Sequence, residues 1–399
     1  MTAFDHSLPA SGGLAQPRVR RPWSLGFEGL PLLFRWLFVL AVGTLLGGVF
    51  LAPARVFANA LLWGNYAVGL GLGGMFFIAI HDVCGAGWAT AFRRVPAAFA
   101  SLVPLGSALV LIAMLAGGDL LYPWMGSEHL EGFKGLWLSR PFAEIRSIVY
   151  VLSWFAFSRA FRRSDASDLS GVGRDRRLGA AFLVVFALSV WLSSVDWIMS
   201  LEPHWFSTMF GVYRFAGLFS AALAATTIAV IVLRRRGAFG TTVGAAHLHD
   251  LGKLMFAFST FWMYIWFSQY MLIWYGNLSE EAVWFQVRTS YGWGELMGLL
   301  VALNWIVPFI VLLPASAKMN ENILMRVAVI LLAGHWLDLF VQIFPTVRAD
   351  LPPIGLLELA ASFAACVAIF LLISSALRER DISPGNHPLF AESSGHPSP

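Results

Sequence analysis

The chain is dominated by ten apolar stretches, each about as long as the hydrocarbon core of a membrane is thick. A helix needs about 20 residues to cross about 30 Å of hydrocarbon. Stretches of that length lie at 30–51, 59–81, 97–117, 142–162, 179–200, 211–233, 251–275, 293–313, 323–344 and 354–377. Backbone polar groups inside a bilayer need internal partners, which favours helices. The sequence therefore predicts an all-α integral membrane protein with ten transmembrane helices.

Composition agrees with a membrane protein and narrows the chemistry of the chain. Hydrophobic residues make up 58% of the 399 residues and charged residues 13%, whereas soluble domains carry about 25% charged residues. Cys84 and Cys366 lie in separate apolar stretches, which excludes thiolate-bound zinc, iron–sulfur clusters and covalent haem c. His81 and His335 differ in depth, which disfavours haem b, and no HExxH spacing is present. We expect this chain to bind no metal and no redox cofactor.

Basic residues predict the orientation of the chain. Nineteen of the 27 lysines and arginines lie in loops or tails on the side of the two termini, and six lie on the opposite side. Cytoplasmic loops carry an excess of lysine and arginine. Both termini are therefore predicted to be cytoplasmic. Because this asymmetry explains the positive charge, membrane lipids are the expected surroundings and nucleic acid is not an expected partner.

Two similar motifs suggest an internal duplication. Asp196 and Asp338 each lie in the outer part of an apolar stretch, and each is followed seven residues later by a proline. The alternative is chance, because proline often ends a helix. We predict two four-helix bundles within six segments: a cytoplasmic tail over 1–29 with no signal peptide, a peripheral helix in 30–58, bundles over 59–205 and 206–350, a second peripheral helix in 351–380, and a flexible tail over 381–399.

The ninth stretch carries two ionisable side chains near its middle. His335 and Asp338 are three residues apart and share a helical face, which Gln342 extends by one turn. Ionisable groups inside a membrane cost a few kcal/mol each and are therefore candidates for function. The functional interpretation is a proton relay, because an imidazole beside a carboxylate can exchange a proton near neutral pH. The alternative is a structural hydrogen bond between helices.

A polar stripe follows the seventh stretch. Lys253, Thr260, Tyr264 and Ser268 recur at helical spacing, and Asp250 is placed to cap the start of that helix. The stripe is interpreted either as the wall of a hydrated path or as polar contacts that pack one helix on another.

The second stretch is rich in glycine and ends in a polar pair. Glycines at 69, 71, 73 and 74 imitate a dinucleotide-binding loop, but no strand precedes them, so close helix packing is favoured. His81 and Asp82 fall at the predicted cytoplasmic boundary. There they would either admit a proton or simply be solvated.

Charged and aromatic residues gather near the predicted outer surface. They would receive a quinol head group or discharge protons, or they would form an ordinary interfacial aromatic belt. The acids are Glu144, Asp196 and Glu295, and the quinone or interface candidates are Glu202, His204, Trp205, Phe206 and Arg214.

Two aromatic-rich runs resemble the F subunit of bacterial alternative complex III. One extends over 196–211 (DWIMSLEPHWFSTMFG), and the other begins with DLGKLMFAFS at 250 and continues through FSQYMLIWYGN at 267–277. The resemblance implies an NrfD-like, polysulfide-reductase-type integral subunit with two four-helix bundles, no redox group of its own and a proposed proton path. The likeness carries over to Asp196, His204, Asp250, Lys253 and Tyr264.

The resemblance also implies partners and a location. Alternative complex III is a quinol:electron-acceptor oxidoreductase of the bacterial cytoplasmic membrane, which oxidises menaquinol and passes electrons to cytochrome c or a similar carrier. The implied partners are a paralogous NrfD-like quinol-binding subunit, multihaem and monohaem cytochrome c subunits, an iron–sulfur subunit and a terminal oxidase. Haem c and the iron–sulfur clusters would lie in those partners, and menaquinone or menaquinol would be the ligand nearest this chain.

These observations lead to one main hypothesis and two alternatives. The main hypothesis is a non-redox membrane subunit of such a complex, which provides a proton path or a quinone-facing surface. One alternative is a stand-alone secondary transporter, for which Asn304 and Pro308 would mark a pocket in the eighth stretch. The other is a structural anchor for peripheral redox subunits.

Overall fold

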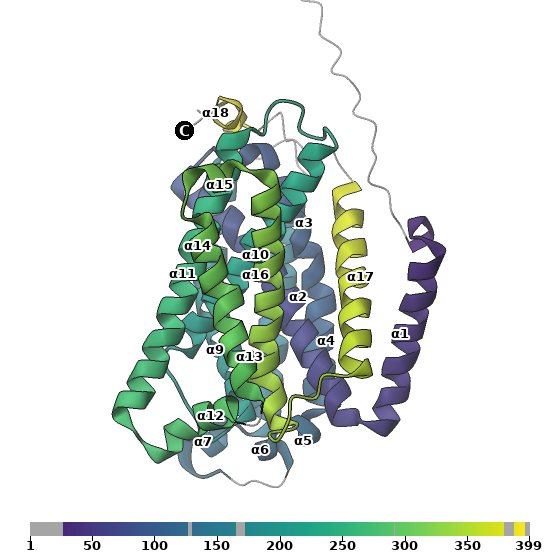
Figure 1. Ribbon diagram of the computed structural model, residues 1–399, viewed down its shortest axis with the longest axis vertical. Helices are drawn as coiled ribbons and strands as arrows, with labels where there is room; N and C mark the ends of the chain where they lie inside the picture. The colour runs from purple at the N-terminus through teal and green to yellow at the C-terminus, as the bar shows by residue number, and fades with distance from the viewer. Residues whose placement is uncertain (1–26, 127–129, 165–171, 291, 379–386, 396–399) are drawn as a thin grey trace, which may run out of the picture.

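The computed structural model describes residues 27–126, 130–164, 172–290, 292–378 and 387–395, and in these residues all regular structure is helical. Figure 1 shows a tall bundle of long helices with short helices at both ends. We call the end with α3 (Arg94–Ala98), α15 (Ala315–Met319) and α18 (Phe390–Ser394) the inner end. The outer end carries α5 (Gly118–Leu121), α6 (Pro123–Gly126), α7 (Gly132–Trp137) and α12 (Ser279–Thr289).

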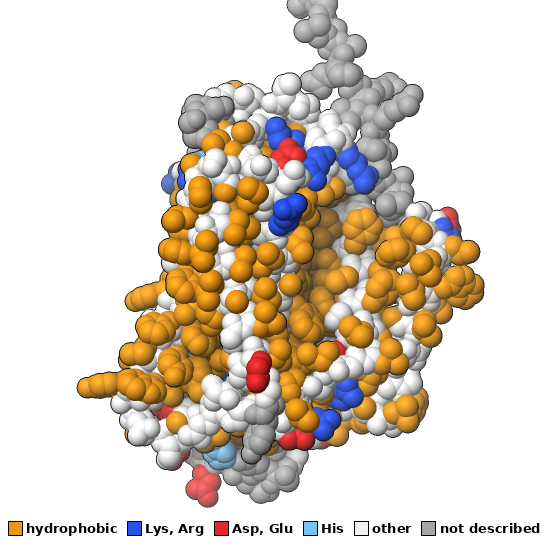
Figure 2. Space-filling view, viewed as in Figure 1, with side chains coloured by type: hydrophobic (Ala, Val, Ile, Leu, Met, Phe, Trp, Pro, Cys, Tyr) orange, Lys and Arg blue, Asp and Glu red, His pale blue; other side chains and the backbone are white. Residues whose placement is uncertain are grey.

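Within the described residues, eight helical stretches are long and apolar enough to cross a membrane. They are α1 (Leu32–Leu51), α2 (Pro53–Cys84), the Thr90–Leu115 stretch that ends in α4 (Val103–Leu115), the Gly173–Leu201 stretch that contains most of α9 (Val172–Trp197), α10 (Phe210–Arg235), the Trp293–Leu312 stretch with α13 (Trp293–Val301) and α14 (Val307–Leu312), the Glu321–Thr346 stretch that begins with α16 (Glu321–Ile343), and α17 (Leu356–Arg378). Figure 2 shows hydrophobic side chains covering the flanks of this bundle. The prediction of an α-helical, multi-pass membrane protein is confirmed.

Two further long helices complete the set of ten predicted stretches. They are α8 (Arg140–Ser164) and α11 (Ala245–Gly276), which are of spanning length but less apolar than the other eight. Both pack against the apolar helices, α8 against α4 and α9 and α11 against α10 and α14. Each predicted stretch therefore coincides with a helix or a continuous helical segment.

Helix α2 lies at the centre of the packing. It contacts α4 and α9 on one side and α10 and α16 on the other, while α10 packs in turn against α11 and α16. Helix α1 packs mainly on α17, and Figure 1 shows these two helices beside the main bundle. We call α2, α4, α8 and α9 the first helix group and α10, α11, α13, α14 and α16 the second helix group; α10 packs directly on α2 and α9 and so joins the two groups.

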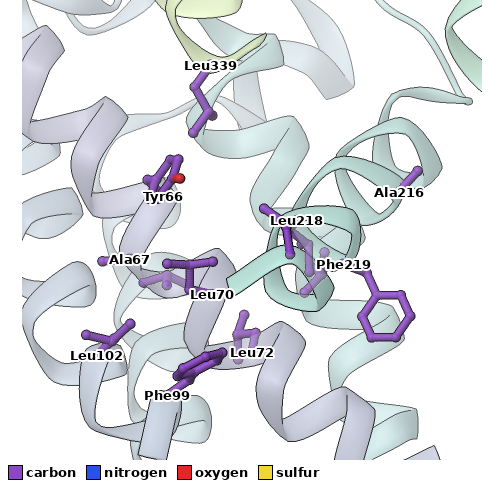
Figure 3. Close-up of a cluster of buried hydrophobic side chains, with 14 of the residues drawn as sticks. Tyr66, Ala67, Leu70, Leu72, Phe99, Leu102, Ala216, Leu218, Phe219 and Leu339 are labelled. Carbon is purple, nitrogen blue, oxygen red and sulfur yellow. The ribbon is translucent and has the colours of Figure 1, made fainter. Parts of the chain in front are cut away.

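Glycines allow α2 to approach its neighbours closely. A Cβ on Gly74 would lie 2.5 Å from the carbonyl oxygen of Pro96, and a Cβ on Gly73 would lie 2.4 Å from the Cβ of Ala222 on α10. Figure 3 shows the packed interior beside them, with Leu70 of α2 near Leu218 of α10. The structure confirms that these glycines serve helix packing.

A cluster of phenylalanines fills the bundle between the two groups. Phe219 of α10 lies 4.8 Å from Phe76 of α2 and 4.5 Å from Phe258 of α11, measured between ring centroids. Phe215 of α10 and Phe186 of α9 extend the cluster. We call these five residues the phenylalanine cluster.

One local prediction was wrong. Helix α11 begins at Ala245 after Gly244, and the side chain of His247 accepts a hydrogen bond from the Gly244 N–H, so Asp250 lies inside the helix and is not its N-cap. Asp250 instead pairs with Lys253 at 2.5 Å. Of the predicted tail over 381–399, the structure describes residues 387–395, which include α18, and this helix packs on the 3-10 helix Thr90–Phe92.

Replacing Gly74 by alanine should destabilise the fold, because the added Cβ would meet the backbone of Pro96. We expect a loss of about 1–3 kcal/mol, as for other overpacked cores. Thermal unfolding of the purified protein in mild detergent measures the loss. Gly47→Ala on α1 is the matched control, since a Cβ there has nothing within 4 Å. Equal melting temperatures for the two variants would contradict the packing role of Gly74.

Candidate functional site

Asp338 lies inside the bundle near the outer end of α16, where it is 1% exposed. The hydroxyl of Tyr213, on α10, donates a hydrogen bond to Asp338 Oδ1. Among the described residues, Asp338 Oδ2 has no hydrogen-bond partner. An ionised carboxylate accepts hydrogen bonds at both oxygens, and a protonated one also donates. The carboxyl group therefore has one occupied oxygen and one open oxygen.

His335 lies one turn before Asp338 on the same face of α16, as predicted. Its ring packs on Tyr66 of α2 with centroids 5.3 Å apart, and neither ring nitrogen makes a hydrogen bond within the described part of the chain. Gly217 of α10 lies beside both side chains. A Cβ at this position would lie only 3.3 Å from Asp338 Oδ2 and from His335 Nδ1, so the absence of a side chain keeps the space next to these two atoms free. The buried polar atoms of His335 and Asp338 thus face one small space.

Arg214 and Gln342 extend this polar group toward the outer end. Arg214 Nη1 donates to Gln342 Oε1 at 3.5 Å, and both side chains are buried. Arg214 also lies near enough to Asp338 for their opposite charges to attract, although no ion pair within 4 Å joins them among the described residues. Tyr213 also packs against Trp262 of α11 at 5.7 Å. We call Tyr213, Arg214, His335, Asp338 and Gln342 the Asp338 cluster.

Arg288 of α12 connects the end of α16 to the outer surface. Its Nε and Nη2 donate to the carbonyl oxygens of Val341 and Gln342 at 2.9 and 3.1 Å, and Nη2 pairs with Glu202 at 2.7 Å. Burial lowers the pKa of Arg288, while Glu202 raises it; an arginine nevertheless stays charged. The side chain of Glu202 is 22% exposed. Charged contacts therefore lead from the backbone beside Gln342 to the surface.

Aromatic side chains dominate the opposite direction, where Ser220 of α10 and Asn304 are also buried. Phe215 and Phe219 follow Tyr213 on α10 toward the inner end, and Phe219 is displaced from Tyr213 by about 9 Å along the helix. With the other members of the phenylalanine cluster they fill the bundle on the inner side of Asp338. Within the described residues, the polar contacts of the Asp338 cluster therefore lead outward.

Asp196 is the counterpart of Asp338 in the predicted duplication, and its surroundings differ. Arg146 of α8 donates to both carboxylate oxygens at 2.8 and 2.9 Å. Tyr150 donates to Oδ2 and Trp137 to Oδ1, each at 2.9 Å. Asp196 is completely buried. Both oxygens of this carboxylate are occupied, and its charge is compensated.

The backbone after Asp196 is held by buried side chains of the outer loop. The Tyr122 hydroxyl donates to the Trp197 carbonyl oxygen at 2.8 Å, and Trp124 Nε1 donates to that of Ser200 at 2.9 Å. Burial raises the pKa of Tyr122 and the nearby Asp196 raises it further, so Tyr122 remains a neutral donor. This site is structural.

The predicted polar stripe on α11 faces away from the interior of the bundle. Tyr264 is 64% exposed and Lys253 is exposed, whereas Thr260 and Ser268 are half-buried. The buried face of α11 presents other side chains, Ser259, Trp262 and Gln269. The stripe therefore does not line the interior of the described bundle, because its position on the helix turns it away from α10 and α16.

The other predicted outer residues are dispersed. Glu144 pairs with Arg140 at 3.0 Å near the surface, and Glu295 is exposed on α13. Trp205 is buried and stacks on Trp284 at 4.9 Å, next to the Arg288–Glu202 pair. His204 and Phe206 are exposed at the outer end. Of these residues, only Glu202 and Trp205 join the contacts around Arg288.

His81 and Asp82, which were predicted to admit a proton, lie at the inner end of α2. Asp82 forms a buried ion pair with Arg93, and His81 Nδ1 donates to the Phe77 carbonyl oxygen at 2.6 Å. His81 follows Tyr66 by about 22 Å along α2, so it is remote from His335.

Sequence reasoning missed Arg288 as a site residue and placed Tyr213 only among the aromatic residues near the outer surface. Arg288 is one of the six basic residues predicted on the side opposite the termini. Trp284, one turn earlier, was an available signal, because it allows cation–π stacking, which the structure shows at 3.9 Å. Among the described residues, no group of three or more histidine, cysteine or acidic side chains lies together as a metal site would require.

Comparison with known proteins does not identify a family. No family model and no curated protein matches this chain.

Replacing Asp196 by asparagine should destabilise the protein strongly, because Arg146 would remain buried without its counter-charge. Removing one partner of a buried ion pair costs about 3–5 kcal/mol, which unfolding in mild detergent would measure. Glu144→Gln is the matched control. It removes a carboxylate from a surface pair and should cost less than about 1 kcal/mol. Similar losses in both variants would argue against a compensated structural carboxylate at Asp196.

Proposed function

We propose that this chain is a non-redox membrane subunit of a quinol:electron-acceptor oxidoreductase complex of the alternative complex III type, and that Asp338 exchanges protons with the outer side. The resemblance in 196–211 and 250–277 supports the type of complex. The buried Asp338 cluster supports the proton exchange. Oxidation of a quinol releases protons, so a membrane subunit of such a complex has a use for a protonatable group within the bilayer.

One observation carries the proposal: the two related aspartates have opposite environments. Asp196 is saturated by Arg146, Tyr150 and Trp137, so protonation would break compensated contacts. Asp338 Oδ2 lies beside the ring nitrogens of His335, and none of these three atoms has a hydrogen-bond partner among the residues that the structure describes. Buried polar groups of this kind are normally hydrogen-bonded to ordered water. A proton can therefore be exchanged at Asp338 Oδ2 with no ion pair to break.

The outward direction of the exchange follows from the neighbouring contacts. Arg214 and Gln342 stand between Asp338 and the Arg288–Glu202 pair, whereas the phenylalanine cluster stands on the inner side. In this proposal the driving force for proton movement comes from redox chemistry in partner subunits. Haem c and iron–sulfur clusters belong to those partners in this proposal, and menaquinol is the proposed reductant.

The outer end supplies a surface for the proposed partners. His204 and Phe206 are exposed there, and they flank Trp205, which is anchored by stacking on Trp284. A cytochrome or iron–sulfur subunit of the complex would dock on this side, while the paralogous quinol-binding subunit would pack within the membrane of the bacterial cell.

Replacing Asp338 by asparagine tests the proposal. The variant keeps an oxygen for the Tyr213 hydroxyl but cannot carry the exchanged proton. We expect the complex to assemble normally and the number of protons released per quinol oxidised to fall. The measurement is made on the purified complex in proteoliposomes, with a quinol:cytochrome c assay and a pH-sensitive dye.

Glu295→Gln is the matched control, because it removes an exposed carboxylate from another apolar stretch. It should leave both quinol oxidation and proton release unchanged. Normal proton release and normal turnover in Asp338→Asn would refute proton exchange at this residue. Purification of a colourless, solitary chain without quinol oxidation would refute the assignment to the complex.

We also propose that all ten helical stretches cross the membrane and that both termini are cytoplasmic. Figure 2 supports this orientation, since lysine and arginine side chains gather at the inner end, although some lie near the outer end. The less apolar α11 extends from the inner end of the bundle toward α12 at the outer end in Figure 1.

Single cysteines on either side of α8 and α11 test this topology in a Cys84→Ser, Cys366→Ser background. Suitable exposed positions are Glu131, Arg176, Arg236 and Glu280. A membrane-impermeant maleimide applied to intact spheroplasts should label positions 131 and 280, and applied to inverted vesicles it should label 176 and 236. Labelling of both positions of a pair from the same side would show that the enclosed helix does not cross.

A further inference from the structure

The C-terminal segment 387–394 is attached to the inner end of the bundle through a buried serine. Ser393 is fully buried on α18. Its Oγ accepts a hydrogen bond from the Ala91 N–H at 3.0 Å and donates to the Trp88 carbonyl oxygen at 2.6 Å. Both partners belong to the segment between α2 and α4. The segment is therefore fixed to the first helix group.

The same hydroxyl also reaches the second helix group. The Gly244 N–H donates to His247 Nδ1 at 3.2 Å, which leaves the ring proton on Nε2. His247 Nε2 lies 3.3 Å from Ser393 Oγ, so it donates to that oxygen. Ser393 thus accepts two hydrogen bonds and donates one, and it joins α11 to the loop after α2.

Glu392 makes the second attachment. Its Oε1 accepts a hydrogen bond from the Gly87 N–H at 3.1 Å. The contact is close, because a Cβ on Gly87 would lie 2.4 Å from Glu392 Oε2 and 3.0 Å from its Cβ. A side chain at position 87 would therefore displace the Glu392 carboxylate and remove this attachment.

The segment forms one wall of a small pocket that has both polar and apolar lining. His81, Asp82, Thr90 and Arg93 line the pocket from the bundle, and His387 and Leu389 line it from the C-terminal segment. Ala89, also in the lining, is only 4% exposed. With the segment in place, His387 and Leu389 cover part of the pocket.

We propose that residues 387–394 are a detachable lid, which closes the inner pocket over His81 and Asp82 and joins the two helix groups while it is docked. Its polar contacts include loop backbone groups at Gly87, Trp88 and Ala91 and the side chain of His247. Water can satisfy these groups when the lid leaves. Release of the lid therefore exposes the pocket without breaking any contact between the long helices. This inference does not depend on the proposed function.

Reactivity of a cysteine in the pocket tests the lid. Ala89→Cys is introduced into the full-length protein with Cys84 and Cys366 replaced by serine, and maleimide labelling is followed in inverted vesicles. Truncation after Asn386 should raise the labelling rate at least tenfold. Cysteine at Arg236, which is exposed on the inner side of the bundle, should be labelled at the same rate with and without the segment.

Gly87→Ala provides a second test that keeps the whole chain and protects against misfolding of the truncated form. This substitution should displace Glu392 and, like the truncation, raise the labelling rate of the cysteine introduced by Ala89→Cys. Gly244→Ala is the matched control, since a Cβ there has nothing within 4 Å, and it should have no effect. Unchanged labelling in Gly87→Ala, with or without a change in the truncated form, would overturn the proposal.

Discussion

The close approach of α2 to its neighbours is the packing constraint on which the rest of the bundle depends. In a membrane, lipid tails are as apolar as leucine, so helices associate through tight packing and polar contacts. Gly74 allows contact with the backbone at Pro96, and Gly73 allows contact with Ala222 of α10. Helix α2 thereby joins the two helix groups. The same approach encloses His335, because Gly69 of α2 lies beside its Nε2 and Gly217 of α10 beside its Nδ1.

The enclosed carboxylates show how partners decide the role of a buried charge. A buried ion pair tolerates its desolvation only where hydrogen bonds satisfy the remaining positions, and Asp196 meets that condition through Arg146, Tyr150 and Trp137. Asp338 has Tyr213 at one oxygen and no protein partner at the other among the described residues. Similar residue types therefore surround both aspartates, but only the first set saturates its carboxylate. The difference arises because Arg214 is directed to Gln342 and forms no ion pair with Asp338.

The sequence was sufficient for the helices and for the shared face of His335 and Asp338, because apolar length and helical spacing are local properties. It was insufficient for the partners of Asp338, since Tyr213 is separated from it by 125 residues and approaches only when α10 packs on α16. The stripe on α11 is a second example. Helical spacing predicts that Tyr264 and Lys253 share one face, but it does not predict that this face points away from the interior of the bundle. The start of α11 was misplaced because a polar Gly244–His247 cap precedes the apolar run.

The asymmetry of the bundle decides how a proton at Asp338 can be used. Charged contacts lead from Gln342 through Arg288 to Glu202, while Phe76, Phe215 and Phe219 occupy the inner direction. A carboxyl group connected to one side only stores or releases protons on that side; transfer across the membrane would require the phenylalanine cluster to rearrange and admit water. Those rings lie at the contact of α2, α9, α10 and α11, where the two helix groups meet. The C-terminal lid joins the two helix groups at the inner end. A small shift between these groups is thus the movement that would extend the one-sided proton site into a path across the membrane.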